Sequence, residues 1–437
     1  MSFDKLPHGW KFISLEDAME AIIDYRGKTP KKTKSGIPLV TAKIVKGGYI
    51  LEPFEFIAND NYDSWMVRGL PKIGDVVLTT EAPLGETAQL TSANVALAQR
   101  IVTLRGKKGL LDNDFLLCAL QSNFVRHQLE SRSSGSTVRG IKQSELRKVS
   151  LPVPPLTEQQ KIARILKSLS NKLVCNTQTN KTIEAMAQAI FKSWFVDFDP
   201  VKAKIRNEQP EGMDALTAEL FPDKLVESEL GLIPEGWEVK PLYDIAEYIN
   251  GAAYKKFEPN TNGLGFPIVK IVELKSGITD KTGFSTVKMP EKYKLNDKDI
   301  LFSWSGNPDT SIDTFIWALG EAWLNQHIFK VIPKPIITRN FLLSLLKSMR
   351  SVFAEIARDK QTTGLGHVTV KDLKRLMVAL PSKELLAKFD DAVSAIINQQ
   401  FNLVKQTQNL EKLRDTLLPK LLSGELELTN EELTDES

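Results

Sequence analysis

Apolar residues in two long stretches of the chain recur with alternating spacings of four and three positions. The first series is Ile162, Leu166, Leu169, Leu173, Asn176, Asn180, Ile183, Ala187, Ile190 and Trp194. The second series is Leu386, Phe389, Val393, Ile396, Gln400, Leu403, Thr407, Leu410, Arg414, Leu417 and Leu421. A seam of this length predicts a coiled coil, and each series is the only evident partner for the other.

The two series superpose at an offset of 227 residues, and so does much of the remaining chain. Residues 6–10 (LPHGW) align with residues 233–237 (IPEGW) at this offset. A repeat of this length is one large unit present twice, not a solenoid. The resulting pseudo-two-fold symmetry predicts an antiparallel pair of helices. An object of this symmetry suits a ligand that also has two halves, such as DNA with two half-sites.

The polar residues of the seam cluster in the middle of each helix. They are Asn176, Asn180, Gln400 and Thr407. Buried amides can set the register of a coiled coil, whereas local fraying or contact with another protein are the alternatives. Thr157 and Gln160 have the spacing of a capping box for the first helix. From Ile162 to Trp194 that helix rises about 48 Å, which fits a spacer between readers of half-sites about 34–36 Å apart.

The segments before the two helices have the pattern of globular heads. Short β-type runs occur at residues 36–40, 75–78, 265–269 and 299–302, and helical stretches at 113–129 and 340–357. We therefore expect an α+β fold with an internal duplication, in which each of two mixed heads is followed by a long helix. The expected boundaries are 1–150 and 231–380 for the heads, 151–205 and 381–425 for the helices, 206–230 for a linker and 426–437 for an acidic tail.

Composition excludes several classes of protein. The chain has 437 residues, of which 42% are apolar, so it can bury two or three cores, and its net charge of +3 is ordinary. It has no apolar run of membrane-spanning length and no signal peptide at Met1–Lys5, so we expect a cytoplasmic protein. Neither the two cysteines (Cys118, Cys175) nor the four histidines (His8, His127, His327, His367) have the spacing of a metal site or a disulfide framework.

The segment from residue 26 to residue 46 contains seven basic residues and no acidic one. They are Arg26, Lys28, Lys31, Lys32, Lys34, Lys43 and Lys46. Glycine and proline interrupt the segment, so it is expected to form loops and strands that present positive charge to phosphates. A solvated basic loop is the alternative interpretation.

A second candidate segment, residues 132–142, combines hydroxyls, glycines and cations and is repeated at residues 361–371. Such a segment can contact phosphates or base edges, or it can be a turn that closes the head onto its helix. Alignment of the two segments places Arg139 opposite Val368, a difference suited to readers of different half-sites. The candidate DNA-binding residues here are Ser136, Thr137, Arg139, Lys142, Thr362, Thr363, His367, Thr369 and Lys371, together with the aligned pairs Gln99–Arg100 and Gln326–His327.

Catalytic patterns are missing from the sequence. It has no glycine-rich phosphate loop, no GxGxxG and no Asn/Asp-Pro-Pro-aromatic tetrapeptide, so we expect a protein that is not an enzyme. Aromatic residues concentrate where the first helix ends, which is typical either of packing within the chain or of a subunit interface. The residues considered for subunit docking are Phe191, Trp194, Phe195, Phe198, Leu417, Leu418 and Leu421.

Several motifs together resemble the specificity (S) subunit of type I restriction–modification enzymes. They are the two Pro-x-Gly-Trp openings and residues 154–160 (PPLTEQQ), 191–200 (FKSWFVDFDP) and 413–425 (LRDTLLPKLLSGE). The resemblance extends from about residue 6 to residue 425, although the copy of PPLTEQQ at residues 381–384 (PSKE) is weaker.

The resemblance implies two target-recognition domains that each read one part of a bipartite double-stranded DNA site. It also implies that the helices dock two modification subunits, which methylate adenine, and that restriction subunits join them. No cofactor is expected in this chain, because S-adenosylmethionine, ATP and Mg²⁺ would belong to those partners. A pseudo-symmetric scaffold that binds proteins instead of DNA is the alternative, and the basic segment at residues 26–46 argues against it.

Overall fold

The computed structural model describes residues 6–135, 138–361, 364–426 and 428. The chain divides into two units, one formed by residues 1–174 with 410–437 and the other by residues 175–409. Each unit contains one head and parts of both long helices, α6 (Leu156–Phe195) and α13 (Lys383–Ser423). The expected α+β fold with an internal duplication is confirmed.

The first head contains two four-stranded sheets. One has the order β2-β11-β8-β9 and is antiparallel, and the other has the order β10-β4-β7-β3. The strands are β2 (Met19–Asp24), β3 (Lys32–Thr33), β4 (Ile37–Val40), β7 (Phe56–Ile57), β8 (Val76–Thr80), β9 (Leu84–Gln89), β10 (Ala96–Leu97) and β11 (Ile101–Gly106). A small hairpin, β5 (Val45–Lys46) with β6 (Tyr49–Ile50), lies beside them.

The predicted helical stretch at 113–129 is two helices, α3 (Asn113–Gln121) and α4 (Asn123–Ser131). Ser122 separates them, because its extended backbone ends α3 while its hydroxyl accepts the Val125 N–H at 3.2 Å and caps α4. Their apolar faces contribute Phe115, Leu116 and Val125 to the main core of the first unit. α1 (Leu15–Ala18), α2 (Tyr62–Trp65) and α5 (Gln143–Leu146) are single turns.

The second head repeats this architecture. Its sheets have the orders β16-β24-β20-β22 and β18-β17-β23-β19. The strands are β16 (Ala246–Asn250), β17 (Phe266–Val269), β18 (Phe284–Ser285), β19 (Lys294–Leu295), β20 (Ile300–Ser303), β22 (Asp313–Ile316), β23 (Ala322–Leu324) and β24 (Ile328–Pro333). The helices are α9 (Ile271–Ser276), α10 (Arg339–Ser348), α11 (Arg350–Asp359) and α12 (Val370–Arg375). The four predicted β runs and both helical stretches are therefore confirmed.

Each head begins and ends at a short antiparallel strand pair. In the first head β1 (Lys11–Ser14) pairs with β12 (Ser150–Val153), and in the second β15 (Glu238–Pro241) pairs with β26 (Met377–Leu380). The chain therefore enters and leaves each head at neighbouring strands, just before a long helix. Between α6 and the second head lie α7 (Asp199–Ile205), α8 (Ala215–Glu219), β13 (Leu225–Ser228) and β14 (Gly231–Pro234).

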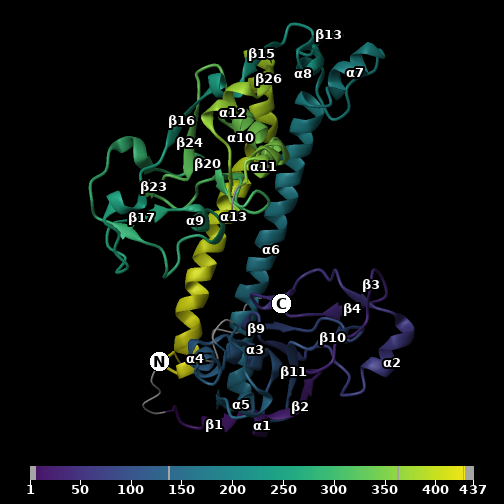
Figure 1. Ribbon diagram of the computed structural model, residues 1–437, viewed down its shortest axis with the longest axis vertical. Helices are drawn as coiled ribbons and strands as arrows, with labels where there is room; N and C mark the ends of the chain where they lie inside the picture. Colours follow the sequence, from purple (N-terminus) through teal and green to yellow (C-terminus); the bar gives the residue numbers. More distant parts are fainter. Residues whose placement is uncertain (1–5, 136–137, 362–363, 427, 429–437) are drawn as a thin grey trace. The chain divides into compact units, whose positions relative to one another are not determined.

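The long helices pack together in an antiparallel arrangement, as the repeat predicts. Within the second unit, Asn176 donates to Gln406 at 2.8 Å, and the rings of Trp194 and Phe389 lie 5.8 Å apart. Later residues of α6 therefore contact earlier residues of α13. The two helices run side by side in opposite directions (Figure 1). Asn176 is only 1% exposed, so a polar pair occupies the seam there.

The start of α6 differs from the sequence prediction. The carbonyl of Pro155 accepts hydrogen bonds from the N–H groups of Glu158 and Gln159, so the helix begins at Leu156 and Thr157 lies inside its first turn. The predicted Thr157–Gln160 capping box is therefore wrong. Proline fixes φ in a range compatible with a helix start, which places the first turn directly after residue 155. Instead, the buried side chain of Gln159 donates to the carbonyls of Leu110 and Pro154.

The aromatic residues at the end of α6 pack within the chain. Phe191, Trp194 and Phe195 are 1%, 9% and 7% exposed and lie 5.0–5.8 Å from the ring of Phe389. They leave almost no surface for a partner, so their expected docking role is not supported, and the same holds for Leu421 in the core of the first unit. Phe198, Leu417 and Leu418 are partly exposed and stay candidates.

We expect Trp194→Ala to lower the free energy of unfolding by about 3–5 kcal/mol, because it leaves a large cavity among aromatic rings. Val196→Ala, at a half-exposed position two residues away, is the matched control and should change stability by about 0.5 kcal/mol at most. Urea unfolding measures both. Normal stability of the Trp194 variant combined with loss of partner binding would instead support a docking role.

Candidate nucleic-acid interface

Three segments of the first head meet at one end of the sheet β2-β11-β8-β9. Arg26 follows β2 and donates to the Ile141 carbonyl at 2.9 Å. Arg100 precedes β11 and forms an ion pair of 2.9 Å with Glu81, the residue after β8. The backbone of Glu81 forms a β-bridge with Gly140.

The ends of these strands lie together because neighbouring strands of the sheet are antiparallel. Thr29 and Gln99, from the same two segments, approach within 3.3 Å through their side chains. Parts of the basic segment, the Gln99–Arg100 pair and the 132–142 segment are thus brought together, as a shared binding surface requires. Arg139 and Lys142 are exposed beside them.

The corresponding end of the sheet in the second head carries a different set of side chains. Trp304, the residue after β20, donates its indole N–H to the Asn250 side chain at 3.2 Å. Its ring centroid lies 5.9 Å from that of His327, which contacts Gln326 at 3.1 Å. Next to Trp304, β21 (Ser305–Gly306) pairs with β25 (Gly366–His367). Gln326, His327 and His367 therefore lie around Trp304.

Sequence reasoning missed Glu81, Asn250 and Trp304. The available signal was position, because each directly follows or ends a strand that leads to this end of the sheet. Without the strand order, nothing in the sequence relates Asn250 to residues more than 50 positions later.

Backbone contacts correct the alignment of the two 11-residue segments. The Ile141 N–H donates to the Thr80 carbonyl at 3.0 Å, and the Val368 N–H donates to the Trp304 carbonyl at 2.8 Å. Ile141 and Val368 are therefore equivalent, at an offset of 227, and Arg139 corresponds to Gly366. The placement of Arg139 opposite Val368 was wrong because it followed glycine positions, whereas the buried strand contacts set the register.

Other candidates in these segments have structural roles or lie outside the described residues. The hydroxyl of Thr369 donates to the Asp372 carboxylate at 2.6 Å and accepts a hydrogen bond from the backbone N–H of Asp372. Thr369 therefore caps α12. Lys371 is exposed on that helix. Ser136, Thr137, Thr362 and Thr363 lie outside the part of the chain that the structure describes.

The structure divides the basic segment among several places. Lys32 and Lys43 approach Glu55 at 2.8 and 3.6 Å, and their positive charges lower the pKa of this carboxyl, chiefly through the hydrogen bond from Lys32. Lys46 lies on the β5–β6 hairpin. In the described residues, Lys28, Lys31 and Lys34 are exposed and form no ion pair. These three are the strongest phosphate-contact candidates of the segment.

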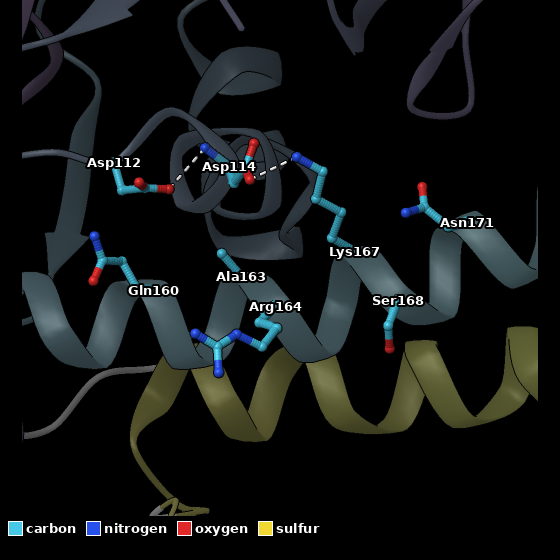
Figure 2. Close-up of a pocket in the computed structure, with 8 residues that line it drawn as sticks. All are labelled: Asp112, Asp114, Gln160, Ala163, Arg164, Lys167, Ser168 and Asn171. Atoms are coloured by element: carbon cyan, nitrogen blue, oxygen red, sulfur yellow. Dashed lines mark hydrogen bonds and ion pairs between the residues drawn. The ribbon is translucent and has the colours of Figure 1, made fainter. Parts of the chain in front are cut away.

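A polar groove forms a second candidate surface in the first unit, between the start of α3 and the N-terminal half of α6 (Figure 2). Lys167 bonds to Asp114 across it at 2.6 Å, and Arg164 is exposed beside them. Its lining residues are Asp112, Asp114, Gln160, Ala163, Arg164, Lys167, Ser168 and Asn171.

The second unit carries different charges at this junction. At the 227-residue offset, Asp112 of the head becomes Arg339, and Ala163 of the helix becomes Asp390. Burial raises the pKa of Asp390 and lowers that of Arg339, while their opposite charges oppose both shifts. The two head–helix junctions are therefore not chemically equivalent.

Within the described residues, no group of three or more His, Cys, Asp or Glu side chains has the arrangement of a metal site. None of the described helices is both long and apolar enough to cross a membrane. Cys118 is buried and burial raises the pKa of its thiol to about 12, whereas Cys175 is exposed.

Comparison with known families decides the affiliation of the chain. The model of the type I restriction modification DNA specificity domain matches it twice, at residues 7–185 and 234–412. The chain belongs to this family. The two matches start 227 residues apart, which is the offset of the internal repeat. Each match includes one head and most of the helix that follows it.

The chain is similar to specificity subunits over most of their length. The MjaIX specificity subunit of a type I restriction enzyme from Methanocaldococcus jannaschii is 29% identical, over 97% of this chain and 94% of that protein. The HindI specificity subunit from Haemophilus influenzae is 28% identical, over 76% of this chain and 82% of that protein. The crystal structure of a type I system S subunit from M. genitalium has a TM-score of 0.55 at 16% identity, covers 98% of each chain and shows the same fold.

Proposed function

We propose that this protein is the DNA-recognition subunit of a type I restriction–modification complex and reads a bipartite site with its two heads. The observation that supports this most strongly is the pair of family domains, each with polar side chains gathered at the same end of its sheet. The side chains differ between the heads: Glu81 and Arg100 in the first correspond to Ser305 and His327 in the second. Two heads with the same scaffold and different contact residues suit two different half-sites.

The chain has no catalytic role in this proposal. Modification subunits that use S-adenosylmethionine, and restriction subunits that use ATP and Mg²⁺, supply the chemistry in the cytoplasm. Docking of the modification subunits uses the partly exposed Leu417 and Leu418 of α13, Phe198 just after the end of α6, and the polar groove beside α6. The different charges at the two head–helix junctions make the two docking positions unequal.

Changing Lys28, Lys31 and Lys34 to Ala should weaken binding of the assembled complex to specific and non-specific duplexes by similar factors. Phosphate contacts position a protein without reading sequence, so the recognised bases should not change. The slope of log affinity against log salt should become less steep by about one unit for each lysine–phosphate interaction that is removed. A fluorescence titration of duplex DNA over a salt series measures this slope.

The control is the double change of Lys32 and Lys43 to Ala, because Glu55 already offsets these charges. It should alter the slope less than the triple change does. An unaltered slope in the triple variant would show that this segment is a solvated loop. Absence of any salt-dependent binding by the wild-type complex would favour the protein-binding scaffold instead.

A further inference from the structure

Trp304 is the centre of a small aromatic and amide cluster in the second head, formed with Asn250, Gln326 and His327. Its indole packs against Phe329 with 5.7 Å between ring centroids and an angle of 32° between the rings. Its backbone carbonyl is held by the N–H of Val368. The ring is therefore fixed on its inner side, whereas the Asn250 and His327 side chains next to it are exposed.

The indole contact determines how the Asn250 amide is oriented. An indole N–H can only donate, so its partner must be the Asn250 oxygen and not the nitrogen. The Asn250 NH₂ group therefore points to other partners, and its oxygen keeps one free lone pair. An exposed carboxamide with a fixed orientation offers a donor and an acceptor side by side, the pattern that matches N7 and N6 of adenine in the major groove.

The first head has a different set of contacts, in which the amide oxygen of Gln99 accepts from the Thr29 hydroxyl at 3.3 Å. There the residue equivalent to Trp304 is Thr80, and the neighbouring positions carry the Glu81–Arg100 ion pair. Arginine at a base edge matches guanine, and glutamate matches cytosine. The amide–indole pair of Asn250 and Trp304 in the second head thus stands where the first head carries an ion pair.

We propose that Asn250 reads an adenine of an A·T pair in the second half-site, with Trp304 as the positioning residue that orients its amide. Gln326 and His327 lie beside Asn250 and Trp304. This inference rests on the proposed function, because it assigns a residue to one head of a DNA-recognition subunit. Ionic contacts with phosphates contribute little to this recognition of adenine, since within the described residues the cluster contains no lysine or arginine.

The test compares the methylated motifs in genomes of hosts that express the complete complex with wild-type chain, Asn250→Ala or Trp304→Phe. Asn250→Ala should relax the preference for adenine at one position of the second half by about 5- to 150-fold, the usual range for one bidentate base contact. Trp304→Phe keeps an aromatic ring and removes the N–H, so it should relax the same position by a smaller factor. The first half should stay unchanged in both variants.

Glu247→Gln is the matched control, because Glu247 is exposed on the same strand three residues before Asn250. It should leave the motif intact. Affinity for non-specific duplex DNA should stay at the wild-type value in all variants, which separates loss of base reading from loss of folding. A smaller relaxation in Trp304→Phe at the same position supports the positioning role, which a purely structural tryptophan would not produce.

Two outcomes would overturn the inference while the proposed function stands. One is a bipartite wild-type motif that Asn250→Ala does not change, and the other is relaxation at a position that prefers a G·C pair. A wild-type complex without any sequence preference would overturn the proposed function itself, and this inference with it.

Discussion

Exchanging the second head for the head of a relative should change one half of the recognised DNA sequence and leave the other half as it is. The exchange is best made between Trp237 and Glu238 and between Leu380 and Pro381, because the paired strands β15 and β26 then move together with the head. The affinity of the complex for the original site should fall by a factor of about 10³ or more. The first half is still read, but the exchanged head binds the second half only non-specifically. Sequencing of methylated motifs in a host that carries the exchanged chain and its partners measures the result.

The control is the same exchange in the first head, between Trp10 and Lys11 and between Val153 and Pro154, which preserves the pair β1–β12. It should change the opposite half only. Each head has a core of its own residues and strands, so neither exchange should alter base reading by the other. Simultaneous change of both halves after either exchange would contradict the proposal of two independent readers.

Insertion of one heptad into both long helices should lengthen the unread spacer of the DNA site by about three base pairs. The insertions lie between Leu173 and Asn176 in α6 and between Gln400 and Leu403 in α13, where both helices are continuous. Seven residues add about 10 Å of helix and preserve the 3.5-residue seam. One turn of DNA spans about 34–36 Å, so 10 Å corresponds to about three base pairs and a rotation of roughly a third of a turn.

This rotation has to be absorbed by twisting of the DNA or by the protein, so affinity for the lengthened site should be lower than that of the wild type for its own site. The bases within each half should stay the same. The matched control inserts the heptad into α6 alone, which leaves seven residues without partners and should reduce stability. A folded, methylation-competent double variant that keeps the original spacer would show that the helices do not set this distance.

Much of the fold could be predicted because its signals are local and repeated. The 4-3 spacing of apolar residues predicts both long helices, and the offset of 227 residues predicts that they pair in opposite directions. The β runs at 75–78 and 299–302 were also recognisable. Strands buried in the middle of a sheet consist mostly of apolar residues, and this apolar run is visible in the sequence. The break at Ser122 was missed because apolar periodicity continues through it, whereas one side-chain hydrogen bond decides it.

The candidate site was predictable only in part. The repeat alone singled out Gln99–Arg100 and Gln326–His327, because polar pairs occur at the same place in both copies. Glu81, the partner of Arg100, and Trp304, which contacts both His327 and Asn250, come from other strands, and only the antiparallel register of the sheets brings them within contact distance. The alignment of Arg139 failed for the same reason, since the buried contacts of Ile141 and Val368, and not the glycines, set the equivalence.

The sequence by itself determined the duplication, the paired helices and the two mixed heads, because periodicity and repetition are properties of the chain read in order. The tertiary structure decided which side chains are available to a ligand. Phe191, Trp194 and Phe195 had the composition of an interface but are buried against Phe389, because a large apolar surface is stabilised by the nearest complementary one. Whether these rings are buried within the chain or exposed to a partner depends on contacts between residues some 200 positions apart in the sequence. No local sequence pattern records such contacts.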